Sequence, residues 1–341
     1  MYKLIVLLLK LQLTFASCKW TPVTPNGITS FRFMSAASTS VGNAIAWCGG
    51  TNLNITNGKF LQERNQVTTY NPTSNTWTTL PNMTARSAPA CAYLSGRLYV
   101  FGGVQKKINA SHHDPDPTIK LSLVESIAVS PDGTTTETKW RKEMDLPFGA
   151  RESPSTTSLS DNAGIIFAGG FDSGETKGSF NFQYYNTSYL FNGKTYTQLP
   201  DMPFKRSNFA LVSKENVVYA FGGGETEPSY ETCASLDMIA KTKKWTKCAS
   251  LINPRSWMAA GVVQNQIIVA GGMDGMFSPT SEVDVLKVVG SRSASNWTDS
   301  NCDLPSAAGF LSGAVTDGGD FVVYIGTAEK NNAYIYSQLS V

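Results

Sequence analysis

A short apolar strand that stops at a pair of glycines recurs along this chain of 341 residues. The clearest copy is Leu98-Tyr99-Val100-Phe101-Gly102-Gly103. Four further copies end at Gly49-Gly50, Gly169-Gly170, Gly222-Gly223 and Gly271-Gly272, and a divergent sixth ends at Gly326-Thr327. The first glycines of successive copies lie 49 to 67 residues apart. Self-similarity at such a period indicates a repeat architecture.

Each glycine pair closes a predicted hairpin of two apolar strands. Residues 88–94 and 98–101, for example, flank the turn Ser95-Gly96-Arg97. Strands that are apolar at nearly every position are typical of strands buried on both faces. After each pair come a polar loop, a third strand, a turn and a fourth strand with an aromatic residue. These aromatic residues are Trp77, Trp140, Tyr196, Trp245 and Trp297.

This order of strand, glycine pair, loop, third strand and tryptophan resembles the kelch repeat. The resemblance extends over essentially the whole chain after Ser17. Kelch repeats form β-propellers of four-stranded blades around a central channel. The resemblance therefore implies an all-β fold, a six-bladed kelch-type β-propeller over residues 18–341, and no sustained helical periodicity contradicts it.

The last repeat has no fourth-strand tryptophan before Val341. A strand of the missing kind stands near the other end of the sequence, at Lys19-Trp20-Thr21-Pro22-Val23. We therefore predict that this N-terminal strand completes the sixth blade. Such a closure would also remove an open sheet edge.

Residues 1–17 have the features of a secretory signal peptide. Lys3 precedes a mostly apolar run over residues 4–16, and Thr14-Phe15-Ala16 offers small residues at the cleavage positions. The alternatives are a buried N-terminal strand and a lipoprotein anchored through Cys18. Nothing later in the sequence resembles a membrane span. Five acceptor sequons agree with a secreted, extracellular glycoprotein, at Asn54, Asn82, Asn109, Asn186 and Asn296.

The six cysteines are an even number, as an oxidising compartment permits. Cys233 and Cys248 lie symmetrically about the turn at residues 240–241, which predicts a cross-strand disulfide. Cys48 and Cys91 fall in inner strands of adjacent repeats and are either a second disulfide or two buried thiols. Cys18 and Cys302 then remain by subtraction, as a third disulfide or as two unpaired thiols.

The loops that follow the glycine pairs emerge on one face of the predicted propeller, together with the segments after the fourth strands. Candidate binding residues on this face are Arg86, Arg151, Arg206, Arg255, Glu225, Asp274 and Tyr230. Arginine presents a planar fork that suits acidic groups. The alternative is that the arginines pair with nearby carboxylates and hold the blades together, which their recurrence at a motif position favours. The variable loops are then the better functional candidates.

Charge and motifs exclude several functions. A formal net charge of +2 does not suggest a nucleic-acid partner. The two histidines, His112 and His113, are adjacent in a long loop, so their side chains point apart and do not suggest a metal site. Copper-dependent propeller oxidases need separated histidines, and this sequence has none. No phosphate loop, nucleophile elbow or zinc motif is present, and we expect no cofactor and no catalytic residue.

The sequence thus predicts a secreted, glycosylated propeller that binds or scaffolds an unidentified extracellular protein or glycan. One alternative is a sugar mutarotase or isomerase on the same fold, which would use arginine and glutamate near the channel mouth. That alternative depends on likeness of fold alone. Another is a component of the extracellular matrix.

Overall fold

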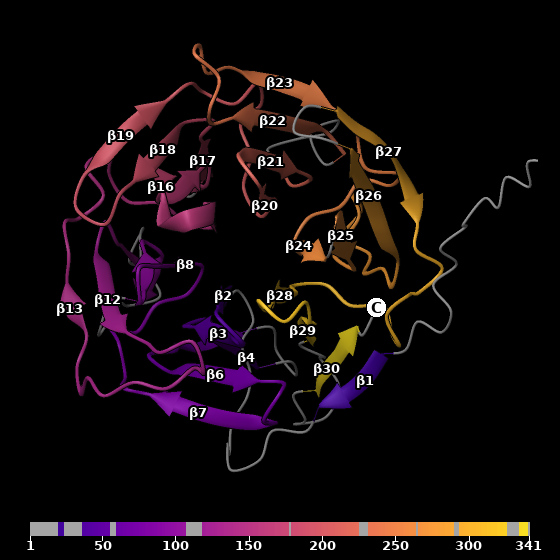
Figure 1. Ribbon diagram of the computed structural model, residues 1–341. Coiled ribbons are helices and arrows are strands. Elements are labelled where there is room, and N and C mark those ends of the chain that lie inside the picture. Colours follow the sequence, from indigo (N-terminus) through magenta and orange to yellow (C-terminus); the bar gives the residue numbers. More distant parts are fainter. Residues whose placement is uncertain are drawn as a thin grey trace, which may run out of the picture.

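The computed structural model describes residues 20–23, 36–54, 59–106, 118–176, 179–224, 231–263, 265–289, 293–325 and 334–339. Apart from one 3₁₀ turn, η1 (Ser160–Asn162), its regular elements are all β-strands. Four-stranded antiparallel sheets stand around a central axis, each with one strand at the centre and one at the rim (Figure 1). The predicted all-β propeller is confirmed.

Five of these sheets are built from strands of a single repeat. From the centre outwards their strands are β2 (Ala37–Val41), β3 (Ala44–Cys48), β6 (Val67–Asn71) and β7 (Thr76–Leu80); β8 (Ala90–Leu94), β9 (Arg97–Phe101), β12 (Val124–Ala128) and β13 (Arg141–Lys142); β14 (Ser155–Ser158), β15 (Ile165–Ala168), β18 (Ser188–Phe191) and β19 (Tyr196–Leu199); β20 (Ala210–Lys214), β21 (Val217–Phe221), β22 (Cys233–Asp237) and β23 (Trp245–Cys248); and β24 (Ala259–Val263), β25 (Gln266–Ala270), β26 (Val283–Val289) and β27 (Ser293–Asp299).

A further four-stranded sheet joins segments from both ends of the described chain. Its strands, from the centre, are β28 (Ser312–Val315), β29 (Phe321–Ile325), β30 (Tyr334–Leu339) and β1 (Trp20–Val23). β1 pairs with β30 in antiparallel register, Trp20 opposite Leu339 and Val23 opposite Ile335. The innermost strands contact one another in the order β2, β8, β14, β20, β24, β28 and back to β2, which encloses a channel.

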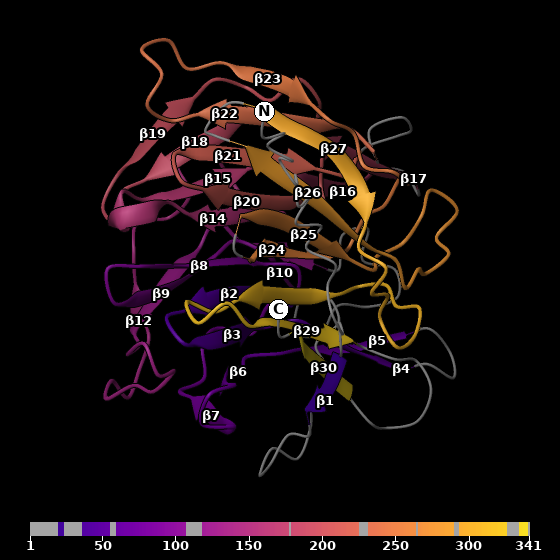
Figure 2. The same cartoon turned by 45° about the vertical axis from the view of Figure 1, so that its right-hand side comes forward.

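Three additional two-stranded hairpins follow the glycine pairs of the first three sheets. They are β4 (Thr51–Asn54) with β5 (Lys59–Glu63), β10 (Val104–Lys106) with β11 (Thr118–Lys120), and β16 (Phe171–Thr176) with β17 (Ser179–Tyr184). Figure 2 shows β4, β5, β16 and β17 on the same side of the ring. The face that carries the post-glycine loops is therefore built up over the first three sheets.

The glycine pairs join each sheet to the next. The amide of Gly103 donates to the carbonyl of Arg151, at 2.8 Å, across the boundary between the second and third sheets. Gly50, Gly170 and Gly223 donate in the same way to Arg86, Arg206 and Arg255, each at 2.9 Å. Gly103 has φ +92°, and a Cβ there would lie 2.6 Å from the carbonyl oxygen of Ser87. Only glycine permits both this backbone conformation and this close approach.

A second set of contacts joins the sheets at the rim, through indole N–H groups. Trp140, Trp245 and Trp297 donate from Nε1 to the carbonyls of Pro81, Pro200 and Ala249, at 2.7, 2.9 and 2.9 Å. Each acceptor lies just after the outermost strand of the preceding sheet. Trp20 makes the equivalent bond to the carbonyl of Cys302, at 3.0 Å. The fourth-strand assignment of Trp140 was wrong by one residue, because β13 spans only Arg141–Lys142.

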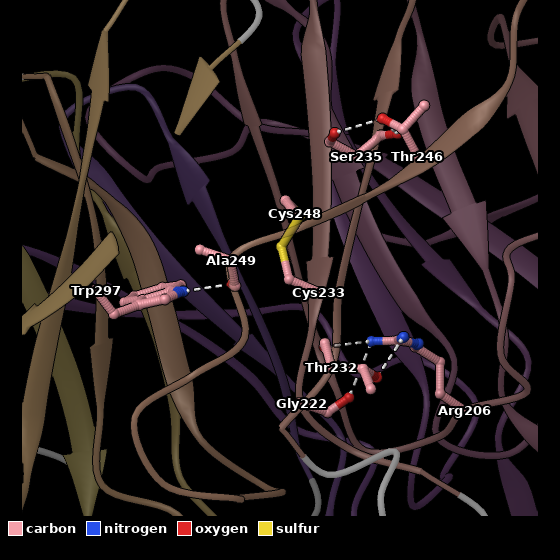
Figure 3. Close-up of a disulfide and its surroundings, with 9 residues drawn as sticks. All are labelled: Arg206, Gly222, Thr232, Cys233, Ser235, Thr246, Cys248, Ala249 and Trp297. Atoms are coloured by element: carbon pink, nitrogen blue, oxygen red, sulfur yellow. Dashed lines mark hydrogen bonds between the residues drawn. A yellow bond between two sulfur atoms is a disulfide. The ribbon is translucent and has the colours of Figure 1, made fainter. Parts of the chain in front are cut away.

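The predicted disulfide between Cys233 and Cys248 is confirmed. The two residues are direct partners on β22 and β23, with 5.0 Å between their Cα atoms (Figure 3). Cys48 and Cys91 are two buried free thiols, and burial raises the pKa of the Cys91 thiol well above its usual range. Cys302 is disulfide-bonded, and Cys18 lies outside the described residues.

The glycine requirement predicts a large difference between two Gly→Ala variants. Gly96 has φ +80° but open space around its Cβ position, whereas Gly103 has both positive φ and the backbone contact. Gly96→Ala should therefore lower the free energy of unfolding by only about 1 kcal/mol, from conformational strain. Gly103→Ala should lower it by more than about 3 kcal/mol. Urea unfolding of both variants measures this difference, and equal losses would contradict the assigned role.

The contacts of Trp20 predict that β1 contributes to global stability. Its ring lies 6.2 Å from that of Phe321, between centroids, and packs against a core cluster shared by the fifth and last sheets. Trp20→Ala should cost about 2 kcal/mol, since the side chain is half-buried, and lower the melting temperature by several degrees. Trp20→Phe should lose less, because it keeps most of the packing. An unchanged melting temperature for Trp20→Ala, measured by calorimetry, would show that β1 is dispensable.

Candidate binding site at the channel mouth

The residues just before the innermost strands share an unusual backbone conformation. Ala88, Ser153, Asn208, Trp257 and Phe310 all have positive φ, between 46° and 54°. A positive φ is uncommon for residues other than glycine and is strained for a bulky aromatic residue. These five residues, which we call the mouth ring, surround the end of the channel where the innermost strands begin.

Backbone hydrogen bonds link the mouth ring from sheet to sheet. Ser153 donates to the carbonyl of Ala88 at 2.9 Å, Asn208 to Ser153 at 3.4 Å, and Trp257 to Asn208 at 2.9 Å. The amide of Leu311 continues the series to the carbonyl of Trp257, at 2.9 Å. These bonds offset the strain of the left-handed conformation. The backbone is thus nearly the same at each position, whereas the side chains are different.

Large apolar side chains gather on one side of this ring. The rings of Trp257 and Phe310 are 5.0 Å apart between centroids, and those of Trp257 and Phe277 are 6.0 Å apart. Phe277 is 62% exposed and its neighbour Met276 is 82% exposed. We call these four residues, Trp257, Met276, Phe277 and Phe310, the mouth patch. An exposed apolar cluster of this kind is unusual on a protein surface that binds nothing.

The loop that carries Met276 and Phe277 is firmly held. Asp274 accepts hydrogen bonds through Oδ1 from the amides of Met276 and Ser278, at 2.9 and 2.8 Å. The backbones of Met273 and Ser256 exchange two bonds of 2.8 Å. The predicted binding residue Asp274 thus has a role inside its own loop. Its carboxylate organises the turn that presents the mouth patch.

Behind the mouth ring, the channel encloses a cavity of about 700 Å³. Its walls are the six innermost strands, with many serine and threonine residues, and Trp257 and Phe310 line its mouth end. Among the described residues that line it, the charged side chains are those of Asp161 and Asp317. The pocket of convergent arginine and glutamate that a sugar isomerase would need is not found in this lining.

The four predicted binding arginines lie inside the protein. Arg86, Arg206 and Arg255 have no exposed surface, and Arg151 is 4% exposed. Arg86 donates to the carbonyls of Gly102 and Leu123, both at 3.1 Å, and pairs with Glu125. Arg255 pairs with Glu282 at 2.8 Å and with Asp284 at 2.6 Å. Each side chain thus bonds to residues of its own repeat, and both the role between blades and a binding role for these arginines stay predictions.

Arg206 and Arg151 use neutral partners. Arg206 donates to the carbonyls of Gly222 and Thr232, each at 3.2 Å, and to the Thr232 hydroxyl at 3.0 Å (Figure 3). Burial without a carboxylate partner lowers its pKa to about 10. The guanidinium of Arg151 lies 3.5 Å from the centre of the Tyr185 ring. Carbonyl oxygens and a ring face thus replace the carboxylates expected from the sequence.

Two carboxylates near these arginines are also buried. Glu152 is 8% exposed and accepts a hydrogen bond from the Ser173 hydroxyl, and Asp284 is 3% exposed beside Arg255. Burial raises the pKa of both carboxyl groups, and the charge of Arg255 only partly opposes this effect at Asp284. These groups hold sheets and loops together and do not face the channel.

The remaining sequence predictions for a site are only partly placed by the structure. Glu225 and Tyr230 lie outside the described residues, as do His112 and His113. Within the described part of the chain, no group of three His, Cys, Asp or Glu side chains is arranged to hold a metal ion. No helix in the same part is long and apolar enough to cross a membrane.

Sequence reasoning missed the mouth ring. Ser153, Asn208 and Trp257 each stand two residues after a motif arginine, at a position where the repeats carry different residues. An alignment of the repeats to one another would have marked this position as variable. It would not have shown the positive φ or the bonds between sheets.

The ring of four-stranded sheets around a lined channel defines this protein as a β-propeller. The solved "Structure of YjhT" superposes with a TM-score of 0.66, over 91% of this chain and 95% of that chain. The two sequences are 16% identical, so the likeness shows the fold alone.

Sequence comparison gives evidence on the family. No family model matches the chain. Alpha-scruin from Limulus polyphemus is 25% identical over 64% of this chain, and Kelch-like protein terF from Aspergillus terreus is 25% identical over 90%. Human Kelch-like protein 30 is 29% identical over 28% of this chain. The chain spans 23%, 63% and 17% of these relatives, less than two thirds of each. Together they support the kelch-repeat family.

Proposed function

We propose that this chain is a secreted, glycosylated kelch propeller that binds a partner protein through the mouth patch. The observation that carries the proposal is the exposure of Met276 and Phe277 beside Trp257 and Phe310. Aromatic and methionine side chains are enriched at the cores of protein interfaces. Their loop is already ordered by Asp274, so binding would need little further loss of conformational entropy.

The proposal includes a closed ring of six blades. The sheet of β28, β29, β30 and β1 is the sixth blade, with the N-terminal strand outermost. Two features support this count: the closed order of contacts among six innermost strands, and the indole bond of Trp20, which matches those of Trp140, Trp245 and Trp297. A closed ring provides a rigid frame on which the mouth patch is presented.

Export is supported by the placement of the sequons that the structure describes. The side chains of Asn82 and Asn296 are exposed, so both have room for a glycan. The side-chain amide of Asn186 donates to the carbonyl of Met202 at 3.1 Å. Asn54 ends β4, and Asn109 lies outside the described residues. We therefore assign glycans first to Asn82 and Asn296.

If the mouth patch binds the partner, charged substitutions within it should weaken the complex. Replacing Met276 and Phe277 together by aspartate should reduce capture of the partner at least tenfold, because two carboxylates would be desolvated at an apolar contact. The matched control is Ile239→Asp, since Ile239 is 66% exposed but lies in the turn between β22 and β23. Quantitative mass spectrometry of proteins captured from extracellular fluid compares the three baits. Equal capture by all three would rule out the mouth patch as the binding surface.

Glycosylation gives a separate test of export. When the full chain is expressed in animal cells, the protein in the medium should lose mass on treatment with an N-glycosidase. Asn82→Gln and Asn296→Gln should each remove one glycan. Retention of the chain inside the cell, or an unglycosylated product in the medium, would contradict the proposed extracellular glycoprotein.

A further inference from the structure

Two cysteines lie beside each other at the boundary between the first and second sheets. Cys48 ends β3, the second strand of the first sheet, and Cys91 lies in β8, the innermost strand of the second. Their side chains belong to one core cluster, together with Leu98 and Val100. The Cys91 thiol forms a side-chain hydrogen bond with Cys48. The two sulfur atoms are therefore neighbours, although the residues are 43 positions apart in the sequence.

Backbone hydrogen bonds fix the approach of the two strands. Directly after Cys48, the amide of Gly50 donates to the carbonyl of Arg86 at 2.9 Å. This bond ties the end of β3 to the segment that leads into β8. On the other side, the Thr156 hydroxyl of the third sheet donates to the carbonyl of Cys91 at 2.7 Å. The two thiols thus meet between strands that are held in place.

This pair differs from the other cysteines in the part of the chain that the structure describes. Cys233, Cys248 and Cys302 are disulfide-bonded, whereas Cys48 and Cys91 are free thiols. Two neighbouring thiols are the reduced form of a disulfide, and an oxidant converts one into the other. An extracellular protein is exposed to oxidising conditions.

Burial determines which oxidants can reach the pair. Cys48 has no exposed surface and Cys91 is 3% exposed. Burial also raises the pKa of the Cys91 thiol, so this group stays protonated and reacts slowly at neutral pH. A protein disulfide or glutathione disulfide is too large to contact either sulfur atom in the closed ring. Hydrogen peroxide is uncharged and little larger than water, so small fluctuations at the boundary admit it.

We propose that Cys48 and Cys91 form an oxidation site, at which hydrogen peroxide closes a disulfide between the first and second sheets. One sulfur atom attacks a peroxide oxygen, the O–O bond breaks, one water leaves and a sulfenic acid remains. The other sulfur atom attacks the sulfenic sulfur, the S–S bond forms, the S–O bond breaks and a second water leaves. The thiols give up two electrons and two protons, and the peroxide takes up both. This inference goes beyond the proposed binding function and does not depend on it.

The new bond would add a covalent link where hydrogen bonds and packing now join the two sheets. A cross-link between residues 43 positions apart restricts the unfolded chain, so the oxidised protein should be the more stable form. Met83 packs in the same cluster, and its flexible thioether can adapt as the sulfur atoms move together.

The test is mass spectrometry of the full-length protein before and after treatment with hydrogen peroxide. Untreated protein, denatured without a reductant, should take up two N-ethylmaleimide groups. Treated protein should take up none and should lose the mass of two hydrogen atoms, and peptide mapping should find Cys48 joined to Cys91. In calorimetry the treated protein should melt several degrees higher. The Cys233–Cys248 disulfide is present in both samples and does not contribute to the difference.

Cys48→Ala and Cys91→Ala are the matched controls. Each leaves one thiol of the pair, so peroxide should form no internal bond and should not raise the melting temperature. If a variant does not fold, peptide mapping of the unaltered protein still decides the question. Uptake of two labels after peroxide, or separate sulfinic acids on the two cysteines, would overturn the inference. A Cys48–Cys91 bond already present in protein from the culture medium would support it, since the same bond would then have formed during export.

Discussion

The structure depends on one repeated hydrogen bond, from the second glycine of each of the first four pairs to the carbonyl of the arginine that opens the next sheet; in the fifth pair Gly272 donates to the carbonyl of Ala308 instead. The arginine side chains extend this connection, since Arg86 donates onward to the carbonyl of Gly102 and Arg206 to that of Gly222. Adjacent sheets share no strand pairing, so these bonds, the indole bonds at the rim and the backbone bonds of the mouth ring are directional contacts that join them. A Cβ on Gly102 would lie 2.7 Å from the carbonyl oxygen of Arg151 and would push the two backbones apart. A buried arginine without its carbonyls would be left undersatisfied.

This arrangement separates the frame from the binding surface. The glycines, arginines and tryptophans of the repeat motif lie mostly inside the ring, where they form hydrogen bonds with neighbouring parts of the protein. Two residues after each arginine, the same backbone conformation presents alanine, serine, asparagine or tryptophan at the mouth, and two residues after Ala308 it presents phenylalanine. Side chains at these positions can vary without disturbing the bonds that link the sheets. The apolar residues have gathered beside the fifth and last sheets, around Trp257 and Phe310, whereas the two-stranded hairpins follow the first three sheets.

Sequence analysis correctly predicted those features that depend on interactions between residues close together in the chain. The hairpin around residues 240–241 sets the register, so Cys233 and Cys248 were predictable as partners. The short apolar strands and glycine pairs predicted the sheets for the same reason. The arginines show the limit of this reasoning. Their position between a loop and a strand is compatible with either a surface or a buried side chain, and only the approach of the neighbouring sheet decides which.

By itself, the sequence determined the repeat, the strands and the propeller fold, because periodicity, turn residues and paired glycines act within a few residues of chain. The tertiary structure alone decided what the channel mouth is like. Trp257 and Phe277 come from the fifth repeat and Phe310 from the next, and the contact between Trp257 and Phe310 exists only after these two sheets have packed together. The positive φ of the mouth ring likewise depends on hydrogen bonds between sheets that are far apart in sequence. The candidate site is therefore a property of the assembled ring and is not contained in any one repeat.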